Sequence, residues 1–255
     1  MRLPRGAARV WLYHGFGTRS PERDPHNLFV SEHMLDAHLR TMRERGWTAL
    51  DLDGWLSGRG GPRSYLVTID DGYPSVLDLA APVLARHAVP AVLFVAPGRL
   101  GGTSDWMPLM PGEPLMSGDR LRELPAFGIE VGAHGYDHTL MQGLDAAALR
   151  LHTVGAADAL ADLTGVRPRS FAYPEGVHDV TAVRAVRDAG YRAAFAVKEG
   201  DGSRFAALRT DVNGTDTERT VGLKSTAWWP VAERLAGRTP ALRAAAHRLV
   251  GSARR

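Results

Sequence analysis

The sequence contains no cysteine in its 255 residues. This absence excludes disulfide bonds, thiolate metal sites and cysteine nucleophiles. Any metal ion would therefore have to be held by histidine, aspartate or glutamate. The absence assigns no compartment, because cysteine-free chains function on both sides of a membrane.

The sequence also lacks a long hydrophobic run, since no apolar stretch approaches the ~20 residues needed to span a bilayer. The N-terminus does not resemble a signal peptide, because Arg2, Arg5 and Arg9 lead directly into the strand-like residues 10–13. We therefore expect a cytoplasmic protein without a transmembrane segment.

The sequence also lacks a large excess of either charge, because 31 basic and 28 acidic residues leave a net charge of only +3. The positive excess lies near the C-terminus, where arginines follow two tryptophans: Trp228, Trp229, Arg234, Arg238, Arg243, Arg248, Arg254 and Arg255. Such a tail suits peripheral contact with an anionic membrane, although a solvated helix face is the simpler interpretation. We expect no binding to nucleic acid, because the basic residues do not alternate with aromatic ones.

Short apolar segments alternate with longer amphipathic segments along most of the chain. Strands are predicted at residues 9–13, 66–69, 91–95, 129–134, 170–173, 192–197 and 208–212, and helices at residues 32–45, 76–87, 119–127, 145–163 and 180–189. The pattern predicts an α/β fold of repeated βα units around a parallel sheet, either a closed barrel or an open wound sheet. In both folds the chemistry lies at the C-terminal ends of strands.

No linker or change in composition divides the chain before about residue 222. We expect one domain over residues 1–222, followed by a basic helical tail over residues 223–255. Residues 97–118 are rich in glycine, proline, methionine and tryptophan and show no clear period. They predict a long surface loop that sets substrate specificity, with Trp106 as a substrate contact.

Two adjacent carboxylates, Asp70 and Asp71, follow the apolar residues 66–69 and precede Gly72. This arrangement indicates a buried strand that delivers charges at its C-terminal end, where a turn can direct both into one cavity. An isolated Asp-Asp-Gly is more often a plain turn. Two carboxylates in one cavity would repel each other unless a cation or a proton lay between them.

Two histidines lie at the end of another predicted strand: His134 is the last residue of the strand at residues 129–134, and His138 follows it. Residues at i and i+4 lie on one face of a helical turn, so both imidazoles could reach one cation. A lone pair at this spacing is more often structural. Together with one carboxylate of the Asp70–Asp71 pair, it becomes a candidate three-ligand site with a fourth position for water, as in catalytic zinc sites. The second carboxylate could then act as a base on that water.

These segments, together with Phe-Ala-Tyr-Pro-Glu-Gly at residues 171–176, resemble three motifs of the polysaccharide deacetylases of carbohydrate esterase family 4, the NodB-homology domain. The motifs occur in the family's order, and the resemblance covers roughly residues 9–213. It implies a single-domain distorted (β/α)7 barrel, here with a helical C-terminal appendix. It also implies metal-dependent removal of N-acetyl groups, and in some members O-acetyl groups, from glycans.

The resemblance assigns roles to the acidic pair and to the two histidines. Asp70 would be the general base, and Asp71, His134 and His138 would bind a divalent metal. Zn²⁺ is the first expectation, and Co²⁺ and Ni²⁺ accept the same ligands.

The third motif implies further site residues. The backbone N–H of Glu175 would stabilise the oxyanion, and Tyr173 and Pro174 would contact the substrate. The chain has Ala172 where many members have an arginine, and Glu175 where a subgroup usually has tyrosine. A carboxylate at residue 175 would favour a cationic or strongly hydroxylated sugar.

Most members end with a Leu-x-His segment whose histidine protonates the departing amine. The only such segment here is Leu12-Tyr13-His14, near the start of the chain. A subgroup carries this Tyr-His motif on its first strand as a circular permutation, which makes His14 the general acid; the alternative is a buried structural histidine. Barrel closure brings the first and last strands together. Asp211, near the end of the last predicted strand, would support His14, although a surface salt bridge is equally compatible.

The sequence therefore predicts a metal-dependent N-deacetylase of an N-acetylated sugar or glycan. Because no export signal is recognised, the expected substrate is intracellular, either a lipid-linked sugar at the inner membrane face or a soluble N-acetylated metabolite. The alternatives are an amidase of a small non-sugar molecule and a catalytically inactive carbohydrate-binding protein. Retention of both aspartates and both histidines argues against an inactive site.

Overall fold

The computed structural model describes residues 8–110, 112–197, 200, 202–226 and 229. The chain divides into two compact units, residues 1–215 and 216–255. In the second unit α7 (Glu218–Lys224) begins after the N-cap residue Thr217. The predicted boundary at residue 222 falls inside α7, and most of the predicted tail lies outside the described residues, so this division stays a prediction. No described helix has the length and apolar character required to cross a bilayer.

The first unit is built on one sheet in which every described strand pair is parallel. Its strands are β1 (Arg9–Tyr13), β4 (Thr48–Ala49), β5 (Ser64–Ile69), β6 (Ala91–Val95), β7 (Ile129–Ala133), β8 (Ser170–Ala172), β9 (Ala193–Ala196), β10 (Ala207–Leu208) and β11 (Thr210–Asp211). Their spatial order is β10-β9-β8-β7-β6-β5-β1-β11, and β4 pairs with β5. A separate parallel pair joins β2 (Gly15–Phe16) to β3 (Phe29–Val30).

The two ends of this sheet are consecutive in the sequence, because only Arg209 separates β10 from β11. β10 pairs with β9, whereas β11 pairs with β1. The parallel sheet is thus nearly closed into a barrel, as the family resemblance implies. The prediction of one strand over residues 208–212 is wrong in detail. The chain changes its pairing partner at Arg209, so two short strands replace one.

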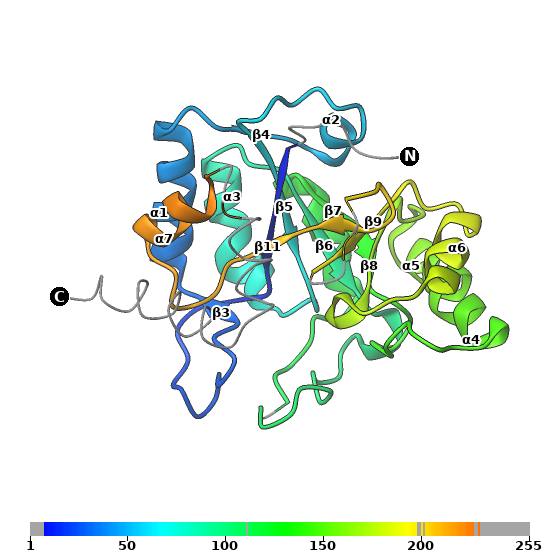
Figure 1. Ribbon diagram of the computed structural model, residues 1–255. Coiled ribbons are helices and arrows are strands. Elements are labelled where there is room, and N and C mark those ends of the chain that lie inside the picture. Colours follow the sequence, from blue (N-terminus) through cyan, green and yellow to red (C-terminus); the bar gives the residue numbers. More distant parts are fainter. Residues whose placement is uncertain (1–7, 111, 198–199, 201, 227–228, 230–255) are drawn as a thin grey trace, which may run out of the picture. The chain divides into compact units, whose positions relative to one another are not determined.

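Helices lie outside the strands, with α1 and α3 on one flank and α5 and α6 on the other (Figure 1). The helices of the first unit are α1 (Glu32–Glu44), α2 (Leu52–Leu56), α3 (Ala81–Arg86), α4 (Ala146–Arg150), α5 (Ala156–Thr164) and α6 (Val180–Asp188). The Ser31 side chain caps α1 by accepting from Met34 N, as expected of an N-cap serine. One-turn π segments precede α3 and α5, and the predicted helix at residues 119–127 is a 3₁₀ segment, Gly118–Phe127.

The barrel interior is filled by apolar side chains from alternate positions of the strands. Phe94 and Phe195 meet at 5.5 Å between ring centroids, and Trp55 of α2 packs on Phe195 at 5.1 Å. Gly132 of β7 gives Phe94 its room, because a Cβ there would lie 2.4 Å from the phenyl ring. The interior is therefore a packed core rather than a channel, and the polar site must lie at an end of the barrel.

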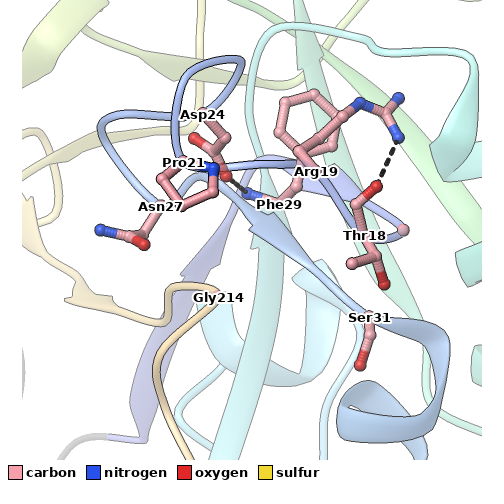
Figure 2. A pocket seen from close by; sticks show the side chains of 9 residues that line it. Thr18, Arg19, Pro21, Asp24, Asn27, Phe29, Ser31 and Gly214 are labelled. Atoms are coloured by element: carbon pink, nitrogen blue, oxygen red, sulfur yellow. Dashed lines mark hydrogen bonds between the residues drawn. The ribbon is translucent and has the colours of Figure 1, made fainter.

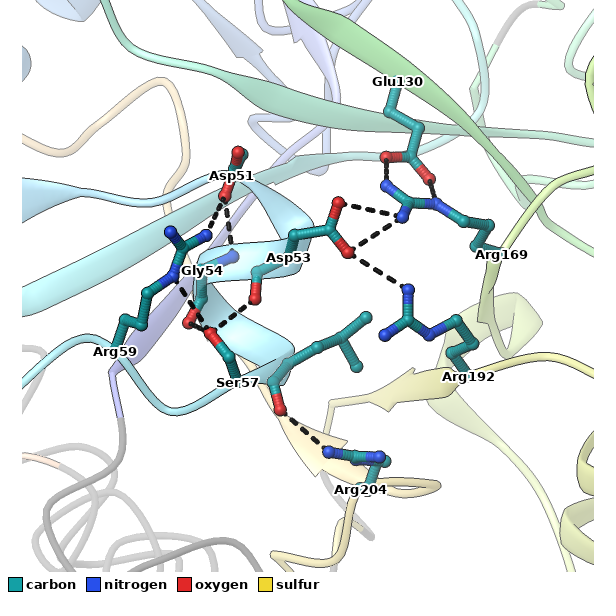
Figure 3. Close-up of polar contacts among 10 residues, drawn as sticks. Asp51, Asp53, Gly54, Ser57, Arg59, Glu130, Arg169, Arg192 and Arg204 are labelled. Carbon is teal, nitrogen blue, oxygen red and sulfur yellow. Dashed lines mark hydrogen bonds and ion pairs between the residues drawn. The ribbon is translucent and has the colours of Figure 1, made fainter.

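The end of the barrel at the N-termini of the strands is closed by ion pairs (Figure 3). Arg169, just before β8, binds Glu130 of β7 at 2.6 Å and Asp53 of α2 at 2.8 Å. Arg192, just before β9, binds the same Asp53 at 3.1 Å. These groups pair with one another, so their ion pairs hold the strands and α2 together at this end.

Candidate metal centre

The acidic pair lies at the opposite end of the barrel, directly after β5. Asp70 and Asp71 are both buried, with exposed fractions of 3% and 6%. Asp71 has a φ of +75°, in the left-handed region that non-glycine residues seldom adopt. This turn brings the two neighbouring carboxylates to one imidazole, because Asp70 Oδ2 lies 3.8 Å and Asp71 Oδ1 3.7 Å from His134 Nε2. Backbone strain of this kind is typical of functional sites.

The Asp71 carboxylate lies close to both predicted histidine ligands. Its Oδ1 is 3.7 Å from His134 Nε2 and 3.5 Å from His138 Nε2. The ligand atoms of the three buried residues all lie within 4.8 Å of one another. Zinc ligands at 2.0–2.1 Å in a tetrahedron are about 3.4 Å apart, so the donor spacing matches that of a bound ion. The donors, two nitrogens and one oxygen, also fit a transition metal.

A backbone contact fixes the tautomer of His134. Its Nδ1 donates to the carbonyl oxygen of Ala172 at 2.7 Å, which directs the Nε2 lone pair toward Asp71. Burial lowers the pKa of His134 to about 4, and the neighbouring carboxylates only partly oppose this effect. The imidazole is therefore neutral at pH 7 and available as a ligand.

His138 reaches the site from a turn rather than from a helix, so that part of the prediction is wrong. Residues 135–137 form a turn, and both Gly135 and His138 have positive φ. The rings of His134 and His138 still meet edge to face, 4.9 Å apart. Trp106 stacks on the outer face of His138 at 4.1 Å and 14°. Trp106 thus contacts a ring of the candidate metal centre, and its predicted contact with substrate stays a prediction.

Asp70 forms an ion pair with an arginine that lies outside the three motifs. Arg209 Nη1 and Nη2 each donate to one Asp70 oxygen at 2.7 Å, and the arginine side chain is fully buried. The signal in the sequence is an arginine inside the predicted strand at residues 208–212, because a charged side chain is seldom buried unless it is paired. Arg209 supplies a guanidinium from a different part of the chain than the motif position held by Ala172.

Both carboxylates stay ionised in this setting. Burial tends to raise the pKa of Asp70, but the Arg209 guanidinium and the neighbouring imidazoles lower it below its ordinary value. Burial acts in the same direction on Asp71, but the hydrogen bond from His138 and the electrostatic interaction with the surrounding imidazoles hold the pKa of Asp71 well below its usual range. Two adjacent anions are thus stabilised by cationic and hydrogen-bonding partners.

His14 lies beside the acidic pair. It directly follows β1, which pairs in register with β5, so that Tyr13 lies opposite Ile69. The Asp70 N–H donates to the Tyr13 carbonyl at 2.9 Å. The His14 ring contributes to the electrostatic field at both carboxylates, and its Nδ1 is buried without a hydrogen-bond partner among the described residues. The first strand therefore delivers an imidazole to the same end of the barrel.

The third motif, at residues 171–176, contributes a backbone turn to this region, whereas two of its side chains, Tyr173 and Pro174, are buried. Glu175 is exposed and has a φ of +52°. Its backbone is therefore in the same left-handed region as that of Asp71. Tyr173 is fully buried, donates its hydroxyl to the Phe205 carbonyl at 2.9 Å and stacks on His178. Pro174 is also buried. Substrate contact by Tyr173 or Pro174 stays a prediction, and the conformation leaves the Tyr173 hydroxyl already occupied.

The predicted supporting residue, Asp211, lies on β11 opposite Leu12 of β1. Its strand neighbours β1, which ends just before His14, and this is the placement that barrel closure requires. The role of Asp211 as a partner of His14 stays a prediction.

Comparison with known families finds a match to the family described as polysaccharide deacetylase over residues 57–194. The matched segment contains Asp70, Asp71, both histidines and Glu175, and leaves His14 and Arg209 outside it. A Bacillus subtilis (strain 168) protein, YxkH, a candidate polysaccharide deacetylase, is 20% identical over 200 residues. That alignment covers 76% of this chain and 66% of the relative.

Solved structures share the fold. A Streptococcus pyogenes deacetylase, PplD, in complex with acetate superposes with a TM-score of 0.74 at 18% identity, covering 86% of this chain and 98% of that one. IcaB from Ammonifex degensii superposes with a TM-score of 0.69 at 25% identity, covering 87% of this chain and 97% of that one.

Proposed function

Because the chain belongs to the polysaccharide deacetylase family, we propose that it is a metal-dependent hydrolase that removes the N-acetyl group from an N-acetylated sugar or glycan. The observation that supports this most directly is the convergence of Asp71, His134 and His138 beside a second buried carboxylate, Asp70. Asp71 lies within 3.7 Å of both imidazoles, which is the spacing of ligands that share one ion.

Asp71, His134 and His138 would hold the divalent ion. The ion, Zn²⁺ by first expectation, would supply Lewis-acid polarisation of the acetyl carbonyl and would lower the pKa of water. The His134 Nδ1 contact with Ala172 and the Trp106 stack on His138 keep both rings aimed at the centre without further rearrangement.

The other residues handle protons and charge. Asp70, held ionised by Arg209, takes the proton from the attacking water as the water oxygen adds to the acetyl carbonyl carbon. The backbone N–H of Glu175 stabilises the negative charge that develops on the carbonyl oxygen. His14 donates a proton to the departing sugar nitrogen as the C–N bond breaks. The products are acetate and a free amine.

The glycan remains a matter of proposal. The exposed Glu175 carboxylate favours a hydroxylated or cationic sugar over an anionic one. A lipid-linked substrate at a membrane face was predicted partly from the basic tail, and most of that tail lies outside the described residues. That idea, the cytoplasmic location and the alternative of a small non-sugar amide therefore stay predictions.

Acetate release tests the proposal. The purified chain is incubated with free, nucleotide-linked and lipid-linked N-acetylhexosamines and with ring amides, after metal loading and after treatment with a chelator. We expect acetate from one class of acetylated sugar, loss of activity with the chelator and recovery on adding Zn²⁺, Co²⁺ or Ni²⁺. Turnover of ring amides alone would favour the small-molecule amidase. The absence of both bound metal and turnover would favour the catalytically inactive carbohydrate-binding alternative.

A further inference from the structure

The two imidazoles of the candidate metal centre are held in different ways. His134 donates from Nδ1 to the Ala172 carbonyl at 2.7 Å. The Nδ1 of His138 is buried and has no hydrogen-bond partner among the described residues. A metal-binding histidine usually has its ring orientation fixed by a hydrogen bond from the second ring nitrogen. The orientation of the His138 ring must therefore depend on other contacts.

The backbone at His138 also needs support from its surroundings. Its φ of +70° lies in the left-handed region, which a non-glycine residue keeps only where neighbouring contacts hold it. Two such contacts reach Tyr136, in the turn that precedes His138. Gly98 N donates to Tyr136 O at 2.7 Å, and Tyr136 N donates to His152 Nδ1 at 3.2 Å. A Cβ at Gly98 would lie 2.8 Å from the Tyr136 ring, so this close approach requires glycine.

Arg99 joins this turn to the ring that covers His138. Its Nε donates to the carbonyl oxygen of Asp137, the residue before His138, at 3.0 Å. Its Nη1 pairs with Asp105 at 3.1 Å, and its guanidinium carbon lies 5.8 Å from the centroid of the Trp106 ring. Trp106 in turn stacks on His138 at 4.1 Å. One planar side chain therefore supports His138 through both its backbone and its ring.

The long loop that carries Trp106 has a second anchor, which does not involve Arg99. Glu113, toward the end of this loop, is buried and pairs with Arg19 at 3.5 Å. Figure 2 shows Arg19 beside Phe29 of β3, where the guanidinium carbon lies 4.5 Å from the centroid of the phenyl ring. The loop should therefore keep its place when Arg99 is replaced, so that the effect of the replacement is confined to the Trp106 ring and the neighbouring turn.

We propose that Arg99 is a positioning residue of the metal centre. It orients the His138 ring through the Asp137 carbonyl and the Trp106 stack, in place of the hydrogen bond that His138 Nδ1 lacks. The inference rests on the proposed metal-dependent function and deepens it, because it assigns a role at the metal to an arginine outside the three motifs. If the Arg99 contacts only stabilised the fold, metal binding would not depend on them.

Metal affinity tests this role without catalysis. Arg99→Met removes the polar contacts of the guanidinium and keeps an unbranched side chain. Titration with Zn²⁺ in competition with a coloured chelator should show binding about 10–100-fold weaker than that of the native chain, the usual effect of losing a residue that orients a metal ligand. The visible absorption of the Co²⁺-loaded variant should also differ, because it reports the geometry of the ligands. Unchanged Zn²⁺ affinity would overturn the inference, whatever the Co²⁺ spectrum.

The matched control is Arg169→Met, because the side chains of Arg169 and Arg99 are similarly exposed, at 36% and 35%. Arg169 forms its ion pairs at the opposite end of the barrel, so its variant should bind Zn²⁺ as the native chain does. An equal loss of affinity in both variants would show a general loss of stability and would overturn the inference. Arg99→Lys keeps the charge but not the planar fork, so its affinity should fall between those of the native chain and Arg99→Met. Native affinity in Arg99→Lys would show that charge alone suffices, against the positioning role.

The inference and the deacetylase proposal fail in different ways. Zn²⁺ affinity that depends on Arg99, without acetate release from any acetylated sugar, would overturn the deacetylase proposal alone. Acetate release by the native chain, together with Zn²⁺ affinity that Arg99→Met leaves unchanged, would overturn the inference alone. A native chain that binds neither Zn²⁺ nor Co²⁺ would overturn both.

Discussion

Arg209 and Asp70 share two parallel hydrogen bonds of 2.7 Å each, in a pair that is almost fully buried. The arginine comes from the point where the chain passes from β10 to β11, and the aspartate from the end of β5. A bidentate pair of this kind fixes the direction of the carboxylate as well as its charge. The orientation of the proposed base therefore depends on barrel closure.

Replacing Arg209 by methionine should cost both stability and activity. The change leaves a buried carboxylate without its cation, and loss of one partner of a buried pair destabilises by about 3–5 kcal/mol. Urea unfolding measures the loss. Arg169→Met is the matched control, because Arg169 pairs with Asp53 and Glu130 at the opposite end and is partly exposed. It should cost about 1 kcal/mol and leave kcat unchanged. Equal effects of the two variants would contradict the special role of Arg209.

The two neighbouring aspartates should differ in what they lose. Asp70→Asn removes the proposed base, so kcat should fall by about 10²–10⁴-fold while the bound metal is kept. Asp71→Asn removes a proposed ligand, so the metal content itself should fall. Metal analysis of both dialysed variants, together with acetate release, separates the two roles. If Asp70→Asn also emerged metal-free, Asp70 would be a ligand and the assignment of the pair would be wrong.

The role of His14 should depend on the leaving group. His14→Ala should slow hydrolysis of an N-acetyl sugar by about 10²–10⁴-fold, because an amine departs poorly without a proton. An aryl acetate leaves as a stable phenolate and needs no such proton, so its hydrolysis should be nearly unaffected. Steady-state kinetics on the two substrates makes the comparison. An equal loss on amide and ester would indicate that His14 only supports the structure.

The metal-free protein should lose stability as the pH falls from 6.5 toward 4. Burial lowers the pKa of His134 to about 4 in the folded chain, whereas the unfolded chain takes up this proton near pH 6.5. The contribution is fully present above pH 6.5 and disappears at the folded pKa, a change of roughly 3 kcal/mol at about 1.4 kcal/mol per pKa unit. Urea unfolding at several pH values should show a smaller acid loss for His134→Asn than for the native chain. His33→Asn, an exposed change on α1, should leave the loss as it is.

The alternation of apolar and amphipathic segments was sufficient to predict most of the barrel. β6 spans residues 91–95 as predicted, since a strand buried on both faces appears as an unbroken apolar run. Ser31 and Gly165 mark a helix start and a helix end, because their local chemistry is fixed by cap geometry. The convergence of Asp71 with the two histidines followed from strand ends meeting at one edge of a parallel sheet.

Other features depend on contacts that the local sequence does not encode. The Arg209–Asp70 pair joins residues 139 apart in the sequence, and neither segment alone specifies the other. The positive φ of His138 arises where tertiary packing overrides the helical spacing of the two histidines. The stack of Trp106 on His138 likewise requires the fold of the long loop at residues 97–118. In each case the sequence shows the type and charge of the residue, but it does not show which distant residue that side chain contacts.

The near closure of the sheet by β10 and β11 has a consequence for biosynthesis. A ribosome makes the acidic turn early, whereas its guanidinium partner emerges only when residue 209 has been translated. Until then Asp70 lacks the guanidinium that pairs with both of its oxygens in the folded chain. The unfinished polypeptide therefore cannot complete the deacetylase centre until Arg209 has been made and β10 and β11 have paired with their neighbours.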